Sequence, residues 1–471
     1  MALAGVKRLG SSLVLIQGLQ LVAFLLMVRY LTVAEMGVVA LIAAIYSGLE
    51  ATTSLGFDKF LLYCDERESQ EDVYSVVWTM QIVRGMSILL LALGAAKIIP
   101  SFFEGMTSLG AMIVAVGCAF VIMSFKNTWV ASFERSKDFS VVAKINTASS
   151  VLKGLAVCCV VIVYQSPWAY VVGQIVGASA VTISSFLYVN RKPYFLINGD
   201  IIEEVFKYSK HLIVIALVSF IAAQFEVFYV GLTINAATLG LYFTWYRMSK
   251  LPRVLMNNLS GRVLFSKASE LRRAGISVIE SYHRCGFLFS MVIMSPFYVF
   301  LFFHGEFLLS VLSVNKYDGT QWLGQYVVLI NWLFLLSMTM APFMLVYIPA
   351  LASKLRVFEA IILVGLVVIL GDIFGLKGIL IASLVSIFIA VLFRIYVLVT
   401  RFYFLKYPYY LWHLAKLIIF IVSPVIIFEG LICEFENHVD SIPLHLLFYI
   451  VYYLVGIAVV ISEYKLLLRN E

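Results

Sequence analysis

The sequence predicts an all-α membrane protein that crosses the bilayer about fourteen times. Hydrophobic residues make up 62% of the 471 residues and charged residues only 13%, whereas soluble proteins carry about 25% charged residues. Apolar runs of about 20 residues recur along the whole chain, and each is long enough to cross a hydrocarbon core of about 30 Å as a helix. The runs are continuous rather than alternating, which favours helices over a β-barrel.

The expected spans follow one another through short connections, none of which is long enough to fold as a soluble domain of about 50 residues. A separate soluble catalytic domain is therefore excluded. In chain order, the expected spans are residues 10–31, 38–57, 75–98, 108–125, 141–163, 168–190, 211–232, 239–261, 284–303, 324–349, 357–373, 377–399, 411–433 and 443–463.

The first span begins after Lys7 and Arg8, as the apolar core of a secretory signal peptide would. It is longer than such a core, and no convincing small-residue cleavage site follows it, so we interpret it as a membrane span. The six cysteines are scattered without a metal-binding spacing. The sequence therefore predicts no disulfide framework, no metal site and no cofactor.

Basic residues set the expected orientation in the membrane. Most of the 34 Lys and Arg residues fall on one side, whereas only Lys97, Lys316 and Lys377 fall on the other side. Short loops rich in Lys and Arg face the cytoplasm, and an even number of spans then places both termini there. This rule explains the net charge of +7 and requires no nucleic acid as a partner.

Two connectors on the basic side have the pattern of helices that lie on the membrane surface. In the first, Glu203 follows Asp200 by three residues, as in a capping box, and apolar residues then recur beside Lys207. The second runs from about residue 266 to 282. The first connector divides the expected fold into a six-helix lobe (1–190), the connector itself (191–210), a second six-helix lobe (211–400) and two additional C-terminal helices (401–471).

A short internal repeat supports the two lobes. The segments 31–37 and 232–240 both begin with Leu-Thr, continue through a turn of small residues and reach a Gly that starts the next span. Repeated six-helix units are a known transporter architecture. The repeat therefore predicts two lobes related by a pseudo-two-fold axis.

Several motifs together resemble a known family. The segment 29–37 has the form Arg-x-Leu-x-x-x-Glu-x-Gly, and the second span ends in Leu55-Gly56-Phe57. Later motifs are Arg191-Lys192-Pro193, Glu203, Phe206-Lys207-Tyr208-Ser209, Gln224-Phe225-Glu226, Gly231, Leu239-Gly240-Leu241-Tyr242 and Gln321-Trp322. In order and spacing these motifs resemble the Wzx-type polysaccharide flippases of the multidrug/oligosaccharidyl-lipid/polysaccharide exporter superfamily. The resemblance covers the first twelve spans best, and Glu226 stands where the family more often has Asp.

This resemblance implies a flippase of the bacterial inner membrane, with two six-helix bundles facing a central cavity. Its cargo would be an undecaprenyl-diphosphate-linked oligosaccharide, the repeat unit of an O-antigen, capsule or exopolysaccharide. Alternating access of the two bundles would carry the cargo from the inner to the outer leaflet. The implied partners are membrane lipids, a polysaccharide polymerase and a chain-length regulator.

Such transport is a problem of solvation. The lipid tail can stay in the bilayer, whereas each sugar hydroxyl stripped of water costs about 1–3 kcal/mol and a bare diphosphate costs far more. Cations in a hydrated cavity would lower that cost, so intramembrane charges are the candidate site. The candidates for cargo binding are Arg84, Arg247, Lys250, Lys153 and Arg29, and those for coupling or pairing are Glu50 and Glu226.

Each candidate also has a structural interpretation. Arg84 lies in the middle of its span and either contacts the cargo or pairs with Glu50. Arg247 and Lys250 form an inclined stripe, which Glu226 pairs with unless it takes a proton. Arg253 follows Pro252 and is interpreted as interfacial.

Other polar and aromatic residues have weaker signals. Arg29 either contacts cargo or pairs locally with Glu35, and Lys153 either lines the first lobe or extends to the surface. The residues interpreted as interfacial are Lys144, Arg284, Arg394 and Lys416, and Asp372 with Lys377 is interpreted as a rim pair. Candidate platforms for sugar rings are Tyr229, Tyr242, Trp245 and Tyr246, although most aromatic residues here are expected to face lipid or the interface.

Two other functions stay open. A multidrug exporter of the same superfamily would need anionic residues in its cavity, and Glu50 and Glu226 are the available ones, but intramembrane cations outnumber them. A membrane-embedded oligosaccharide polymerase or ligase would be expected to have a large outer loop, which is absent from the sequence. No Gly-x-x-x-x-Gly-Lys-Ser/Thr loop occurs, so ATP is not an expected energy source.

Overall fold

The computed structural model describes residues 2–53, 56–63, 70–103, 106, 108–136, 138–254 and 279–402. Within these ranges the regular structure is helical and no strand occurs. Eight helices there are long and apolar enough to cross a membrane, and Ile16–Tyr30 and Leu109–Ser124 are shorter apolar helices. The predicted all-α, polytopic membrane fold is confirmed. The last two expected spans, 411–433 and 443–463, lie outside the described residues.

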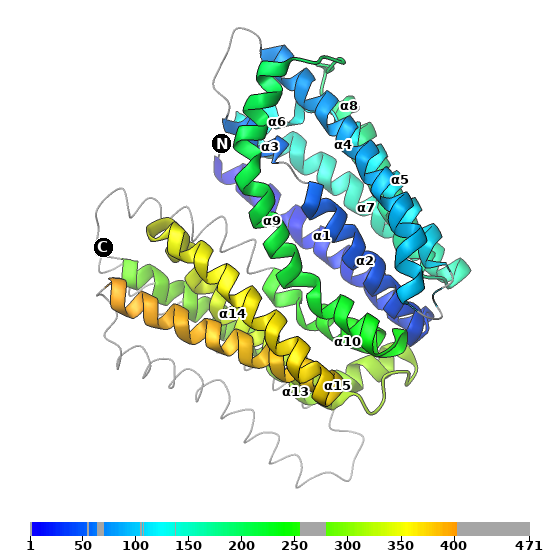
Figure 1. Ribbon diagram of the computed structural model, residues 1–471, viewed down its shortest axis with the longest axis vertical. Helices are drawn as coiled ribbons and strands as arrows, with labels where there is room; N and C mark the ends of the chain where they lie inside the picture. Colours follow the sequence, from blue (N-terminus) through cyan, green and yellow to red (C-terminus); the bar gives the residue numbers. More distant parts are fainter. Residues whose placement is uncertain are drawn as a thin grey trace. The chain divides into compact units, whose positions relative to one another are not determined.

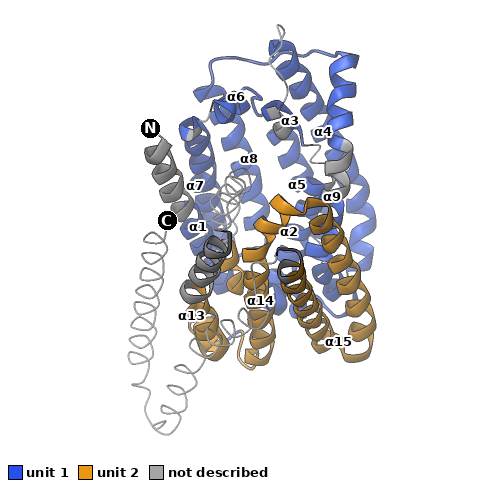
Figure 2. Cartoon of the chain, turned by 90° about the vertical axis from the view of Figure 1, so that its left-hand side faces the viewer, with its two compact units in different colours: residues 1–243, 312–316 blue, residues 244–311, 317–471 orange. Residues whose placement is uncertain are grey.

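The chain forms two compact units (Figure 2). Unit 1 comprises Met1–Phe243 together with the short segment Leu312–Lys316. Unit 2 comprises Thr244–Val311 and Tyr317–Glu471. These units are defined by packing, whereas the expected lobes follow from the connector at 191–210 and the sequence repeat, so the division into two six-helix lobes stays a prediction.

The helices of unit 1 follow the expected spans closely (Figure 1). For example, the span expected at 168–190 is α8, Trp168–Tyr188. The other helices are α1 (Ala2–Tyr30), α2 (Val33–Thr53), α3 (Phe57–Tyr63), α4 (Gln70–Ile98), η1 (Ile99–Phe102), α5 (Leu109–Ser124), α6 (Val130–Arg135), α7 (Phe139–Tyr164) and α9 (Gly199–Thr233). Helix α10 (Ala236–Ser249) begins in unit 1 and ends in unit 2.

The first connector differs from the expectation. We expected a separate surface helix with a capping box from Asp200 to Glu203, but α9 is one helix of 35 residues that continues into the next span. Asn198 caps it, because its extended backbone lets the side-chain oxygen accept from the N–H groups of Asp200 and Ile201. Glu203 instead pairs with Lys207 at 2.8 Å, one turn further along the helix.

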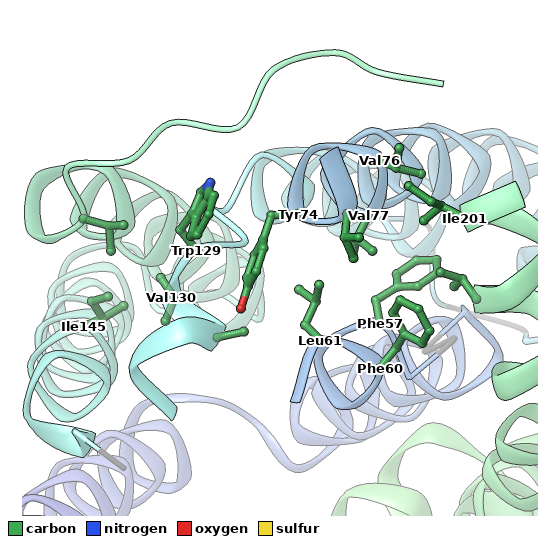
Figure 3. Packing of buried hydrophobic residues seen from close by; sticks show 14 residues of the cluster. Phe57, Phe60, Leu61, Tyr74, Val76, Val77, Trp129, Val130, Ile145 and Ile201 are labelled. Carbon is green, nitrogen blue, oxygen red and sulfur yellow. The ribbon is translucent and has the colours of Figure 1, made fainter. Parts of the chain in front are cut away.

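A buried apolar core joins α3, α6, the first turns of α4 and the first turns of α9 (Figure 3). At its centre the rings of Tyr74 and Trp129 stack, with centroids 4.2 Å apart and planes 6° apart. Thr128 donates its hydroxyl to the Tyr74 carbonyl at 2.9 Å, which ties the chain before α6 to α4. These contacts fix one end of the membrane-spanning helices of unit 1.

Unit 2 contains the remaining long helices, α13 (Ile279–Ser313), α14 (Gln321–Tyr347) and α15 (Pro349–Phe402). Helix α15 is broken at Gly375, whose φ of 58° suits a residue without a Cβ. This break separates the two spans expected at 357–373 and 377–399.

One charged residue of α15 corrects the sequence interpretation. Arg394 was expected at the interface, but it is buried and paired with Glu359 from the other half of the helix. The break at Gly375 separates the two halves, and a charge buried in the membrane requires such a partner. Lys416 and the Arg284 side chain lie outside the described part of the chain.

Candidate functional site

A polar cluster lies among the membrane-spanning helices of unit 1. Tyr46 and Glu50 come from α2, Arg84 from α4 and Tyr170 from α8, and the other three residues all act electrostatically on the Tyr46 hydroxyl. Arg84 is half-buried and Glu50 is exposed. We call these four residues the Arg84 cluster. The structure thus places Arg84 and Glu50 both within electrostatic range of Tyr46 and adds two tyrosines that the sequence did not single out.

Close helix packing fixes this cluster in place. A Cβ on Gly85, next to Arg84, would lie 2.5 Å from the Ser124 hydroxyl of α5. A Cβ on Gly48, between Tyr46 and Glu50, would lie 2.7 Å from the ring of Phe220 on α9. The helices beside the cluster therefore pack closely at these two glycines.

Lys153 is held inside unit 1 rather than reaching toward a membrane surface. Its ammonium donates to the side-chain oxygen of Gln174 at 2.8 Å, and Gln174 is only 6% exposed. The aliphatic stem of Lys153 packs on Gly177 of α8, where a Cβ would lie 3.3 Å from it. The segment Gly173-Gln-Ile-Val-Gly177 is a small-residue motif carrying an amide in an apolar span, and this signal could have identified Gln174.

Glu226 has a tyrosine as its partner. The buried hydroxyl of Tyr242 on α10 donates to the Glu226 carboxylate on α9. Burial removes Tyr242 from the candidate sugar platforms. Trp245 is removed for the same reason, because it is fully buried and donates its indole N–H to Thr320 at 3.0 Å.

The basic stripe of α10 and the turn after it belongs to unit 2. The Lys250 ammonium lies 5.4 Å from the centroid of the Tyr246 ring, and Arg247 is half-buried in the last turn of α10. Arg253 donates to the buried Asn331 at 3.2 Å and lies 4.2 Å from the centroid of the Phe334 ring. Arg253 therefore has a structural role, with a buried asparagine rather than the interface as its hydrogen-bond partner.

Arg29 is exposed at the end of α1, beside a capped turn. Glu35 accepts from the backbone and hydroxyl of Thr32 at 2.8 and 2.9 Å, and its own N–H donates back to the Thr32 hydroxyl. This is a capping box at the start of α2. Lys316, which the sequence analysis uses only to orient the chain, donates to the carbonyls of Arg29 and Leu31 at 2.6 and 3.1 Å. Desolvation and then the Arg29 charge lower the pKa of Lys316.

The two copies of the sequence repeat contact each other within unit 1. A Cβ on Gly37 would lie 1.9 Å from the Ala236 carbonyl oxygen, and a Cβ on Gly240 would lie 1.8 Å from the Val33 carbonyl oxygen. Val33 and Ala236 are the first residues of α2 and α10, and each glycine follows one turn later. The contact is therefore reciprocal, as the repeat would require of a pseudo-two-fold relation.

Two further lysines, Lys377 and Lys144, each lie over an aromatic ring. The Lys377 ammonium lies 5.3 Å from the centroid of the Trp322 ring, and the exposed Lys144 lies over Tyr188. Within the described residues, no three His, Cys, Asp or Glu side chains come together as metal ligands would.

The sequence and the fold are similar to those of known proteins. The family described as polysaccharide biosynthesis protein matches residues 26–324. The teichuronic acid biosynthesis protein TuaB of Bacillus subtilis (strain 168) is 22% identical over 265 residues, which are 56% of this chain and 54% of that protein. The chain thus matches about half the length of this curated relative.

Two groups of solved structures share the fold. The lipid II flippase MurJ, in an inward closed conformation, superposes with a TM-score of 0.71 at 12% identity, covering 96% of this chain and 98% of that one. An inward-facing multidrug resistance MATE family transporter of the MOP superfamily superposes with a TM-score of 0.63 at 16% identity. This match covers 80% of this chain and 93% of that one. At these identities the likeness shows a common fold.

Proposed function

Because the chain belongs to the polysaccharide biosynthesis protein family, we propose that it is a flippase for an undecaprenyl-diphosphate-linked oligosaccharide. The observation that carries the proposal is Arg84, a half-buried cation fixed in a membrane-spanning helix among two tyrosines and a glutamate. A cation at such a depth is costly unless it faces polar groups or a polar passage. The cargo proposed here is an anion with many hydroxyl groups.

The lipid bilayer solvates one part of the cargo, and the protein must solvate the other part. Burying the lipid tail gains about 0.8 kcal/mol per CH₂ group, so the tail stays in the bilayer throughout. The diphosphate and the sugars are the barrier, because each loses water as it crosses. The cations proposed to replace water around the phosphates are Arg84 and Lys153 in unit 1 and, considered separately, Arg247 and Lys250 in unit 2.

The neutral polar groups beside these cations suit the sugar part of the cargo. Tyr46 and Tyr170 bring phenol rings and hydroxyl groups to Arg84, and Gln174 brings an amide to Lys153. Rings stack on the apolar faces of sugars while hydroxyl and amide groups bond their edges. Arg29 is the weakest member of the proposed site, because it lies exposed at the end of α1.

Transport needs an energy source or a net concentration difference. We propose that Glu226 couples transport to an ion gradient, because a half-buried carboxylate held by a tyrosine hydroxyl can take up a proton or a sodium ion. Glu50 is the second candidate for this role. Alternating access would then expose the cargo site first to one leaflet and then to the other.

The proposed topology follows from the positive-inside rule. Both termini lie in the cytoplasm, the basic loops face it, and the membrane is the inner membrane of a bacterium. The turn with Arg29, Glu35 and Lys316 then lies on the outer side. A polymerase and a chain-length regulator would act on the cargo after it crosses.

A multidrug exporter is the second candidate function, because MATE transporters share the fold and Glu50 and Glu226 would suit cationic drugs. One experiment separates the two. The purified chain is reconstituted in liposomes that contain either a lipid-linked oligosaccharide or a cationic dye. We expect sugar head groups to appear in the outer leaflet, where a lectin counts them, and no dye movement. Dye movement without head-group transfer would establish the exporter instead.

A further inference from the structure

The chain between α8 and α9 forms an extended segment, residues 191–197, which we call the rim segment. It is attached to α4 by hydrogen bonds along its length. The N–H groups of Tyr194 and Leu196 donate to the hydroxyls of Ser75 and Thr79 at 3.4 and 3.1 Å. The Tyr194 hydroxyl donates to Asp72 at 2.5 Å. The rim segment therefore has a defined position despite having no helix or strand of its own.

The inner side of the rim segment packs on aromatic residues of unit 1. Leu196 packs against the buried core of unit 1, and Pro193 is buried. The Arg191 guanidinium lies 4.7 Å from the centroid of the Trp129 ring, which in turn stacks on Tyr74. These contacts link the segment to the core that contains Tyr74 and Trp129 (Figure 3).

The outer side of the same segment exposes large apolar side chains. Phe195 is 67% exposed and Ile197 is 80% exposed, although the backbone that carries them is fixed. An ordered segment that holds apolar side chains outward is unfavourable in water and favourable at a lipid surface. Because the backbone is ordered in advance, little conformational entropy is lost when these side chains enter lipid.

The position of the rim segment along the membrane normal agrees with a lipid contact. It starts three residues after the end of α8, a helix of 21 residues that is just long enough to cross the bilayer. The last residue of that helix, Tyr188, has the Lys144 ammonium 5.8 Å from its ring centroid. Tyrosines and lysines at span ends mark the membrane–water interface.

The positive charge of the rim segment favours binding of anionic lipids. Arg191 and Lys192 are both exposed, and residues 189–198 contain no acidic side chain. The nearby carboxylate of Asp72 already accepts the Tyr194 hydroxyl. Basic side chains beside exposed apolar ones are the pattern that binds anionic phospholipids at a membrane surface.

We propose that the rim segment binds anionic phospholipids, with Phe195 and Ile197 entering the edge of the leaflet and Arg191 and Lys192 binding the phosphates. The assignment to the inner leaflet rests on the topology proposed above, whereas the lipid contact does not depend on transport. Asn198 follows directly and caps α9, the helix that carries Glu226. The bound lipids therefore fix the starting point of a helix of the proposed site.

The apolar contact is tested by fluorescence. In a chain whose native cysteines are replaced by alanine, Ile197→Cys carries a small fluorophore, and Glu203→Cys, on the exposed side of α9, is the matched control. In liposomes we expect spin-labelled lipids to quench position 197 and aqueous iodide to quench position 203. Iodide quenching of position 197 as strong as that of position 203 would overturn the proposal. Protection of position 197 in native membrane vesicles but not in liposomes would mean that a protein covers the segment, and would also overturn it.

The phosphate contact is tested by thermal unfolding in detergent with added phosphatidylglycerol or phosphatidylcholine. We expect phosphatidylglycerol to raise the Tm of the wild type, and R191Q/K192Q to lose at least half of that shift, with K97Q unchanged. If R191Q/K192Q does not fold, K192Q alone is used, because Lys192 is exposed. Equal shifts in all variants would contradict the proposal. Arg84→Ala, which we expect to slow flipping, should leave both lipid readouts unchanged, so failure of the proposed function is distinguishable.

Discussion

Gly37 and Gly240 occupy equivalent places in two contacting turns, and each has the other turn's carbonyl oxygen where its own Cβ would be. The two glycines come from the two copies of the sequence repeat, which are about 200 residues apart in the chain. A backbone approach of this kind is open only to glycine. The contact therefore explains why both copies reach a glycine at this point.

Alanine at either glycine should destabilise the protein. A Cβ at 1.8–1.9 Å from a carbonyl oxygen cannot be accommodated without moving a helix, and we expect G37A and G240A to lose about 1–3 kcal/mol or more of stability. The measurement is thermal unfolding in detergent. Gly94→Ala is the control, because nothing lies within 4 Å of its Cβ position, and its Tm should not fall. A Tm for G37A equal to that of G94A would contradict this packing.

Apolar runs located the spans from the sequence because a helix that crosses lipid must be apolar over its length. Residue partners were harder to predict, because they depend on which helices meet. Glu226 was assigned to a proton or to the Arg247 stripe, and the structure adds Tyr242, sixteen residues further along the chain. Arg394 was placed at the interface by its position near a span end, yet it pairs with Glu359 within broken α15.

The start of α9 is ambiguous in the sequence because two neighbouring residues could cap it. Asn198 and Asp200 are both good capping residues, and the sequence does not say which one has the extended backbone that a cap needs. The structure gives Asn198 that backbone, so the helix begins earlier than expected. The capping box at Thr32 and Glu35 can also be found in the sequence, whereas our interpretation of Glu35 considered only its charge beside Arg29.

Glu226→Gln tests the coupling role. Glutamine can still accept the Tyr242 hydroxyl but cannot ionise, so we expect an unchanged Tm and a loss of the response of flipping to proton and sodium gradients. The measurement is the head-group transfer rate in liposomes with and without each gradient. A gradient response equal to that of the wild type in E226Q would assign Glu226 to structural pairing.

Lys153→Met and Gln174→Leu separate stability from cargo binding. Q174L leaves the ammonium without its amide partner and should cost about 1–3 kcal/mol of stability. K153M alone leaves the buried Gln174 amide without this donor and should cost a similar amount, whereas K153M/Q174L replaces both partners by apolar groups and should keep the Tm while slowing flipping. Thermal unfolding and head-group transfer are measured for all three variants. Normal flipping by a folded K153M/Q174L would remove Lys153 from the cargo site.

The Asp138 cap should give a pH-dependent contribution to stability. Hydrogen bonds from the side chain and backbone of Ser140 lower the pKa of Asp138, which caps α7. A lowered folded-state pKa means that the contribution is present above the unfolded value of 3.8 and is lost as the pH falls through the folded value. The Tm difference between wild type and D138A should therefore be constant near neutral pH and shrink in acid. A Tm difference between wild type and D138A that grows as the pH falls would contradict this prediction.

The central claim is that intramembrane cations carry a phosphorylated sugar across the membrane, and Arg84 tests it most directly. The rate of head-group transfer is measured in liposomes for the wild type, for the single variants R84A, R84K and E50Q, and for the double variant R84A/E50Q. We expect R84A to lose about tenfold or more, because a charge-assisted hydrogen bond contributes about 1.5–3 kcal/mol, with partial recovery in R84K and none in R84A/E50Q. Wild-type transfer by folded R84A, or full recovery in R84A/E50Q, would show that Arg84 only balances the Glu50 charge.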